Sequence, residues 1–342
     1  MKLDSTRDLL VQAERVLAQE LAPIKVYLDD PAVQEVMINR PDRVFIERNG
    51  QFERLELTIS EDKLVSAITT LSNVNRKGVT PVLDCRLPGL RIAATLPPVA
   101  VQGPAMSIRR HSARAFTLDD YVASGAFSRS GGADAHEEPL KALAGEAAAG
   151  GDALKAFFEA MIRARINFIV SGSTSSGKTA FLNALARLIP ADTRVLTIED
   201  TAELTMHVDN WLAFEANPVF GIDVRSLVRH ALRNRPNRIW VGEGRGAEFY
   251  DILDAYNTGH PGSAVSFHSD SAAMALPRLE NMIRMAPEAS NWPLADLRRQ
   301  IAATFKFVIH CTHQGGRRGP SEVMAIDGCT DTGYLTRTVF RR

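Results

Sequence analysis

Residues 172–179 read GSTSSGKT, and this stretch decides the fold of the second half of the chain. It matches the phosphate-binding loop pattern G-x-x-x-x-G-K-[ST] in full. The apolar run 166–170 before it predicts a buried strand, and residues 179–188 after it predict a helix that ends before Pro190. A loop between strand and helix turns backbone N–H groups inward and adds the positive end of the helix dipole. The pattern predicts a site for a polyanion; the alternative is a Gly/Ser-rich turn that matches by accident.

The positions of this loop have predicted roles in nucleotide binding. We expect the Lys178 ammonium to reach the β- and γ-phosphates and the Thr179 hydroxyl to bind Mg²⁺. The predicted ligands are therefore ATP and Mg²⁺. The predicted nucleotide-binding residues are Gly172, Ser173, Thr174, Ser175, Ser176, Gly177, Lys178, Thr179 and Ala180.

Length and composition set outer limits on function. A chain of 342 residues is long enough for about two domains. Its 40 basic and 40 acidic residues cancel, so composition gives no sign of a nucleic-acid footprint. Cys85, Cys311 and Cys329 form no C-x-x-C pair, which argues against a disulfide framework and a zinc site. No window approaches the ~20 apolar residues of a membrane span, so we expect a cytoplasmic protein for which any membrane association is peripheral.

The first third of the chain predicts a small α+β domain. Residues 5–28 have the spacing of an amphipathic helix, Asn49-Gly50 is a tight turn between two strands, and residues 61–74 predict a second helix. The predicted strands are 35–39, 44–47, 52–57 and 90–96. Residues 128–151 are rich in Ser, Gly, Ala and charge, which indicates a linker with one or two Ala-rich helical turns. The predicted organisation is an N-terminal α+β domain over 1–118, a linker over 119–152 and a phosphate-loop domain over 153–342.

Beyond residue 152, strands and helices alternate. The predicted strands are 168–170, 194–198, 238–242, 264–267 and 305–310, and the predicted helices include 223–233, 247–256 and 272–285. This alternation predicts an α/β fold in which a doubly wound parallel sheet carries the phosphate loop after an early strand.

Carboxylates follow two of these strands and are candidates for catalysis. Glu243 ends the apolar run 239–242, which places it at the carboxyl edge of the sheet, where it could orient water and support the Mg²⁺ shell. A surface glutamate in a strand-to-helix turn is the alternative. The stretch RVLTIEDTAE delivers Glu199, Asp200 and Glu203 to the end of another strand. They suit metal or water binding, although helix capping explains some of them equally well.

Two histidines frame a glycine-rich turn and the strand after it. His260 and His268 lie eight residues apart without a partner cysteine, which is a poor zinc spacing. His268 at the end of the strand is a candidate to hydrogen-bond a phosphate or Glu243, as a γ-phosphate sensor. A purely structural histidine is the alternative.

Four ordered motifs together resemble a known family. They are GSTSSGKT, RVLTIEDTAEL, RPNRIWVGEGRGAEFYDILDAYNTGHPGS and VSFHSDS. They look like the phosphate loop, acidic box, second nucleotide motif and histidine box of the secretion-superfamily ATPases, and are most similar to the hexameric ATPases of type IV secretion and conjugative transfer. The resemblance covers most of residues 153–312 and is weaker in LDDPAVQEVMIN, LPGLRIAATLPP and SIRRH.

The resemblance implies a homohexameric ring whose subunits hold nucleotide between an N-terminal and a RecA-like C-terminal domain. By this likeness Glu243 is the catalytic carboxylate and His268 belongs to the sensing box. Arg91, Arg109 and a further candidate, Arg110, match positions from which the N-terminal domain reaches the γ-phosphate. A solvated basic turn is the alternative for Arg109 and Arg110. Implied partners are inner-membrane secretion or conjugation components and the other cytoplasmic ATPases of the system; direct nucleic-acid binding is left open.

One departure from the family and several rival functions remain. Family members commonly carry a larger apolar residue where this chain has Gly244, so we expect a looser turn after Glu243. The rivals are a pilus retraction or type II secretion ATPase, a RecA-like nucleic-acid motor, and a scaffold that binds nucleotide without turnover. The type II enzymes usually carry a four-cysteine zinc element that this chain lacks, and Glu243 counts against the scaffold.

Overall fold

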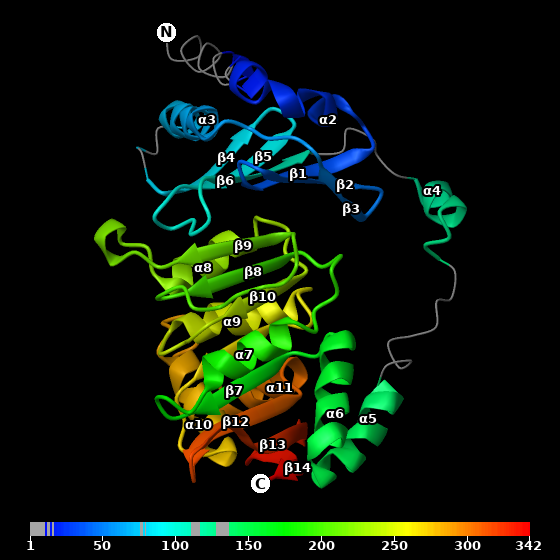
Figure 1. Cartoon of the computed structure of the whole chain (residues 1–342), viewed down its shortest axis with the longest axis vertical. Coiled ribbons are helices and arrows are strands. Elements are labelled where there is room, and N and C mark those ends of the chain that lie inside the picture. The colour runs from blue at the N-terminus through cyan, green and yellow to red at the C-terminus, as the bar shows by residue number, and fades with distance from the viewer. Residues whose placement is uncertain are drawn as a thin grey trace. The chain divides into compact units, whose positions relative to one another are not determined.

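The computed structural model describes residues 11, 14, 15, 17–75, 78, 80–110, 117–127 and 137–342. The chain divides into two compact units, one of Met1–Gly132 with Arg233–Arg235 and one of Ala133–Leu232 with Pro236–Arg342. Each unit has its own sheet and its own hydrophobic core (Figure 1). The predicted combination of α and β structure in two sheets is confirmed. Among the described residues, no helix is both long enough and apolar enough to cross a membrane.

The first unit is built on a six-stranded antiparallel sheet. Its strands are β1 (Val33–Arg40), β2 (Arg43–Arg48), β3 (Gln51–Leu55), β4 (Val82–Leu87), β5 (Leu90–Thr95) and β6 (Ala105–Arg110), in the spatial order β3-β2-β1-β6-β5-β4. Strands β4 and β6 were not predicted, because each mixes charged with apolar residues. Arg109 and Arg110 are the last two residues of β6, so the alternative of a basic turn is excluded.

One face of this sheet is apolar and is covered by helices. Helix α3 (Glu61–Val74) has the predicted bounds and buries Leu64, Ile68 and Leu71 in the core of the unit. The 3₁₀ turn η1 (Ala22–Ile24) and helix α2 (Lys25–Asp29) precede the sheet, and α4 (Leu118–Ala123) follows it. Of the helix predicted over 5–28, residues 5–10, 12, 13 and 16 lie outside the described residues. The remainder is interrupted at Pro23, which cannot donate a helical hydrogen bond.

The second unit contains an eight-stranded mixed sheet. Its strands are β7 (Phe168–Gly172), β8 (Val195–Glu199), β9 (Trp211–Glu215), β10 (Arg238–Val241), β11 (Ala264–Phe267), β12 (Phe307–Gln314), β13 (Arg317–Cys329) and β14 (Tyr334–Arg341). The order is β14-β13-β12-β7-β11-β10-β8-β9, and the six strands from β12 to β9 are mutually parallel. Strands β13 and β14 add in antiparallel fashion, so the prediction of an all-parallel sheet is wrong at this edge. Pro320 within β13 weakened the strand signal there.

Helices connect and cover these strands. They are α5 (Glu137–Glu146), η3 (Ala147–Ala149), α6 (Gly151–Arg163), α7 (Lys178–Ala186), η4 (Pro218–Phe220), α8 (Val224–Ala231), α9 (Glu248–Asn257), α10 (Ala272–Arg284) and α11 (Leu294–Thr304). Helices α6 and α7 share a core cluster with Phe168 and Val170 of β7. Helix α5 and η3 fall within the segment that the sequence indicates as a linker, yet Leu140, Ala144 and Ala147 are buried in this core. Their apolar faces outweigh the linker-like composition around them.

Candidate active site

Four neighbouring parallel strands of the second unit end at one edge of its sheet. Gly172 ends β7, His268 follows β11, Glu243 follows β10 and Glu199 ends β8. In the sheet these strands lie in the order β7-β11-β10-β8. Because parallel strands place their carboxyl ends at the same edge, motifs spread over about a hundred residues of sequence meet there. The structure therefore brings together the phosphate loop, the histidine and the carboxylates that the sequence singled out.

The phosphate loop joins β7 to α7 in a conformation suited to an anion. Gly172 and Gly177 have φ values of +149° and +93°, and Ser175 has +60°. A Cβ at Gly172 would lie 2.3 Å from the Cys311 carbonyl oxygen, so only glycine fits. The buried Ser176 hydroxyl has no hydrogen-bond partner in the described structure. Together with the N–H groups of the first turn of α7, it offers donors to phosphate oxygens.

Lys178 is buried at the start of α7 and points back over the loop. Its Nζ donates to the carbonyl oxygens of Gly172 and Ser173, each at 3.1 Å. Burial lowers the pKa of Lys178, while the nearby Glu243 charge acts in the opposite direction. Thr179, the predicted Mg²⁺ ligand, is half-buried beside it and Ala180 is exposed. The loop thus has a cation on its inner side and a hydroxyl next to that cation.

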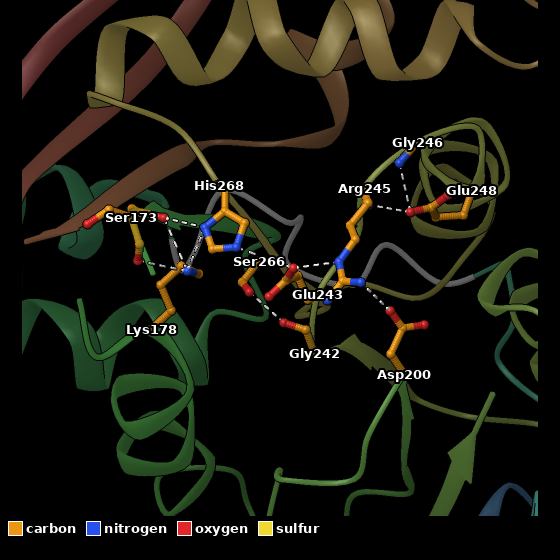
Figure 2. Close-up of polar contacts among 11 residues, drawn as sticks. Ser173, Lys178, Asp200, Gly242, Glu243, Arg245, Gly246, Glu248, Ser266 and His268 are labelled. Atoms are coloured by element: carbon orange, nitrogen blue, oxygen red, sulfur yellow. Dashed lines mark hydrogen bonds and ion pairs between the residues drawn. The ribbon is translucent and has the colours of Figure 1, made fainter. Parts of the chain in front are cut away.

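His268 links the phosphate loop to Glu243 (Figure 2). Its Nδ1 lies 3.3 Å from Lys178 Nζ and 3.1 Å from the Gly172 carbonyl oxygen. Its Nε2 lies 3.4 Å from Glu243 Oε1. An ionised carboxylate only accepts, so the Nε2–H tautomer and the protonated ring are the forms that would donate to Glu243. Nδ1 then either accepts from Lys178 in the neutral ring or donates to the Gly172 carbonyl in the protonated ring. The two arrangements differ by one proton at Nδ1.

Glu243 is partly buried among positive groups. Arg245 Nε donates to Glu243 Oε1 at 2.8 Å. Burial alone would raise the pKa of Glu243, but the Arg245 hydrogen bond and the charges of His268, Arg245 and Lys178 outweigh it and lower the pKa. The carboxylate is therefore ionised at neutral pH. An ionised carboxylate at this edge can accept a hydrogen bond from a water and hold that water in one orientation.

The turn that carries Glu243 is tightly held. The N–H of Gly244 donates to the Ser266 carbonyl at 2.8 Å, and the Ser266 hydroxyl donates to the Gly242 carbonyl. A Cβ at Gly244 would lie 2.4 Å from the ring of Phe249. The expectation of a looser turn is therefore wrong, because the Phe249 ring fills the space that a larger residue would take.

The carboxylates of the acidic box differ in burial: Glu199 is buried, whereas Asp200 and Glu203 are exposed. Glu199 is buried and accepts from the backbone N–H groups of Glu203, at 3.1 Å, and of Leu204. Burial raises the pKa of Glu199 to about 7, against these hydrogen bonds. Asp200 lies 3.2 Å from Arg245 Nη1, and the Glu203 side chain is exposed. No helix begins at residues 200–207, so helix capping does not explain these carboxylates. Glu199 instead stabilises the loop at 203–204 by accepting from its backbone N–H groups.

The remaining candidates are three arginines of the first unit, Arg91, Arg109 and Arg110, and His260 of the second unit. Arg91 on β5 and Arg109 on β6 are direct cross-strand partners in the first unit, so they share one face of its sheet. Arg110, the next residue, faces the opposite side because strand side chains alternate. Arg91 also lies 3.6 Å from Asp84. His260 Nδ1 lies 3.0 Å from the Pro236 carbonyl, away from His268. No group of three or more His, Cys, Asp or Glu side chains among the described residues is arranged to hold a metal ion.

Two features of the site were missed from sequence. Arg245, two residues after Glu243, contacts both Glu243 and Asp200. Its position inside the quoted motif was the available signal. The hairpin of β12 and β13 also supports the phosphate loop, because Gly319 N–H donates to the Ser176 carbonyl at 3.0 Å. No local pattern in the sequence links these two residues.

The strand, phosphate loop and helix place the chain among the P-loop α/β proteins. Its sequence matches the family described as Type II/IV secretion system protein over residues 144–334. It is 31% identical over 319 residues to the conjugal transfer protein TrbB of Rhizobium radiobacter, covering 91% of this chain and 89% of that protein. It is 33% identical over 323 residues to the type IV secretion system protein VirB11 of Brucella suis biovar 1, covering 89% and 88%.

A solved structure gives the same answer for the fold. The crystal structure of the VirB11 ATPase from the Brucella suis type IV secretion system, in complex with sulphate, superposes with a TM-score of 0.83 at 30% identity. The match covers 92% of this chain and 96% of that one. The chain belongs to the type II/IV secretion system protein family. Its resemblance to the ATPases of type IV secretion and conjugative transfer, inferred from four motifs, is confirmed.

Proposed function

We propose that the chain hydrolyses ATP at the carboxyl edge of its second sheet, with Lys178 binding phosphate and Glu243 orienting water. As an ATPase of its family, it energises type IV secretion or conjugative transfer. One observation carries the assignment of the site: Lys178, His268 and Glu243 form a continuous series of contacts beside a loop that holds a buried, unpartnered hydroxyl. The conjugation and type IV secretion relatives match this chain along most of their length, which favours this function over a pilus retraction or type II secretion ATPase.

The donors of the loop fit the phosphates of a nucleotide. Phosphate oxygens can accept from the Ser176 hydroxyl, the first N–H groups of α7 and the Lys178 ammonium. Thr179 offers one hydroxyl oxygen, which suits Mg²⁺ because this ion takes few protein ligands and completes its shell with water and phosphate. When bound, Mg²⁺ would neutralise phosphate charge. The remaining predicted loop residues would contribute mainly through their backbone.

Hydrolysis at this site would depend on position and charge. A loose phosphoryl-transfer transition state needs an aligned water and stabilised equatorial oxygens. Glu243, ionised and anchored, would hold the water, and Lys178 would stabilise the developing charge. His268 contacts both residues and can hold a proton at Nδ1. Its hydrogen bonds would therefore change when Lys178 moves from the loop carbonyls to a phosphate. Glu199 and Glu203 would then act on the shape of the site.

We further propose the assembly that family membership favours. Six copies would form a ring in which each RecA-like, doubly wound second unit is completed by an N-terminal domain over 1–118, with Arg91 and Arg109 directed to the γ-phosphate. The ring would act in the cytoplasm, peripherally attached to the inner membrane, with the membrane components and other ATPases of its system as partners.

Replacing Glu243 by glutamine tests the proposal. Glu243→Gln keeps the volume but removes the carboxylate charge, so it should bind ATP with near-normal affinity and hydrolyse it at least ~10²-fold more slowly. Single-turnover hydrolysis and filter binding of radiolabelled ATP measure the two quantities. The control is Glu159→Gln, a glutamate of helix α6 that pairs with Lys155 and has no contact, within the described structure, with the residues of the proposed site. Rapid hydrolysis by Glu243→Gln would move the catalytic role elsewhere, first to Glu199 or Glu203.

A further inference from the structure

We propose that Arg245 is a positioning residue for hydrolysis: its guanidinium holds the Glu243 carboxylate and is itself held by Asp200 of the acidic box. The inference rests on the proposed role of Glu243. It gives the acidic box a function that neither metal binding nor capping supplies. The three side chains lie side by side in Figure 2.

The contacts of Arg245 use two different nitrogens of one planar group. Nε donates to Glu243 Oε1 at 2.8 Å, and Nη1 lies 3.2 Å from Asp200 Oδ2. A guanidinium presents its donors in a fixed fork, so orienting one edge on Asp200 also orients the edge that faces Glu243. A lysine ammonium has a single nitrogen on a flexible stem and cannot transmit orientation in this way.

The backbone that carries Arg245 is fixed independently of its side chain. The N–H groups of Arg245 and Gly246 both donate to Glu248 Oε1, the latter at 2.9 Å. The preceding N–H, of Gly244, is bonded to the Ser266 carbonyl. Arg245 therefore starts from a rigid turn, and only its exposed side chain needs an anchor. Asp200 supplies that anchor from the loop after β8.

Both contacts of Glu243 fall on the same oxygen. Arg245 Nε and His268 Nε2 approach Oε1, at 2.8 and 3.4 Å. With a proton on Nε2, two donors on Oε1 would fix the plane of the carboxylate and leave the other oxygen, Oε2, to accept from a water. Without Arg245, only the longer His268 contact would define this plane. The carboxylate would then rotate about its terminal torsion, which is a soft one, and the water would lose its alignment.

The strand order explains why the acidic box is near enough to act. Strand β8 lies beside β10, and Asp200 follows the last residue of β8 while Glu243 follows β10. The series Lys178, His268, Glu243, Arg245 and Asp200 follows the order β7-β11-β10-β8 across the sheet edge. Asp200 lies at the end of this series that is farther from the phosphate loop, so it acts on Glu243 through Arg245.

A double-mutant cycle on the full-length protein tests the proposal. Arg245→Gln should lower kcat for ATP by about 30-fold and change KM less than about 3-fold, since alignment in the transition state is lost and phosphate binding is kept. Asp200→Asn should lower kcat by about 5-fold. The double variant should be no slower than Arg245→Gln alone, because Asp200 acts only through Arg245. Arg245→Lys should recover little.

The control is Arg278→Gln, which removes another arginine lining the same ~400 Å³ pocket beside His268 and should stay within about 2-fold of the unaltered protein. Thermal unfolding of every variant identifies any that are merely destabilised. Multiplied effects in the double variant, or recovery of full kcat by Arg245→Lys, would overturn the proposal. If Arg245→Gln is fast while Glu243→Gln is inactive, only this inference fails; if Glu243→Gln is also fast, the proposed site itself fails.

Discussion

The two sheets of this protein distribute charge in different ways. In the antiparallel sheet of the first unit, Glu35, Arg109, Arg91 and Arg86 occupy directly opposed positions on four strands, forming a row across one face. In the second sheet, charge is concentrated at the carboxyl edge of the parallel strands, where Lys178, His268 and Glu243 are in contact.

The difference follows from strand direction. Antiparallel neighbours alternate their ends, so charged residues are paired along the ladder and stay spread over the face. Parallel neighbours end together, so one residue from each strand reaches a single point. The edge can therefore bring several functional groups into contact in one site, whereas the charges of the row are spread over four strands. Substitutions at the edge should cost more activity than substitutions in the row.

The largest expected effect is at the phosphate loop. Lys178→Ala should reduce ATP hydrolysis by at least ~10³-fold, about 4 kcal/mol of transition-state stabilisation, because its buried ammonium is the group proposed to bind the phosphates. Steady-state phosphate release measures the loss, and circular dichroism checks the fold. Lys155→Ala, an exposed lysine of α6, is the control. Near-normal turnover in Lys178→Ala would remove the edge from the mechanism.

The buried carboxylate of the edge should make stability depend on pH. Burial first of all raises the pKa of Glu199 from 4.5 to about 7. Its stabilising contribution is complete below pH 4.5 and is lost as the pH rises through about 7. Over this range, the unfolding free energy should fall by about 3 kcal/mol relative to Glu199→Gln, measured by urea denaturation from pH 4 to 8.

The exposed neighbour Glu203 provides the comparison for this measurement. Glu203→Gln should keep most of this pH dependence, because burial is the largest cause of the raised pKa of Glu199 and the Glu203 charge is a smaller one. Parallel pH profiles for the unaltered protein and Glu199→Gln would contradict the assignment of a buried, raised-pKa carboxylate at this edge.

The charged row gives a smaller expected effect on activity. If Arg91 and Arg109 supply charge to the γ-phosphate, as family membership favours, Arg91→Ala with Arg109→Ala should lower turnover by about 10²-fold. Arg86→Ala is a close control, because Arg86 is the direct cross-strand neighbour of Arg91 and is exposed. Equal effects of all three arginines would indicate general surface charge, and full activity of the double variant would end the proposed role of the row.

Much of the second unit could be predicted because its signals are local. The loop 172–179, the apolar run before Glu243 and the strand before His268 each carry their pattern within a few residues, and parallel topology then implies their meeting. The hairpin of β12 and β13 was not predictable in this way, since its support of Ser176 through Gly319 depends on the pairing of β12 with β7, a strand distant in the sequence. Likewise, the charge of Arg245 is evident from the sequence, but its contacts with Glu243 and Asp200 are not.

The one or two helical turns predicted inside the linker underestimated α5 for a related reason. Ala and Gly lower the apparent hydrophobicity of residues 137–149, yet Leu140, Ala144 and Ala147 line up on one face and are buried. Small residues can be buried fully by close packing, which composition does not reveal. The boundaries predicted for the linker and the two domains remain predictions.

The smallest expected effect sharpens the comparison at the turn after Glu243. Gly244→Ala adds a Cβ that would lie 2.4 Å from the buried Phe249 ring, which packs edge-on against Phe267 at a centroid distance of 5.3 Å. Overpacking of this kind should cost about 1–3 kcal/mol of unfolding free energy. Gly246→Ala is the matched control, because its nearest neighbours would be 3.6 Å away, and it should cost less than about 1 kcal/mol.

Phe249→Leu in the Gly244→Ala background removes the clash and should restore part of the stability, since leucine is smaller and leaves room for the new methyl group. Urea denaturation of the three variants gives the free energies, and their ATPase rates show whether displacement of the ring moves Glu243. If Gly244→Ala is as stable as the unaltered protein and Gly246→Ala is not, the turn adapts freely. The close packing around Gly244 would then not be what holds Glu243 in place.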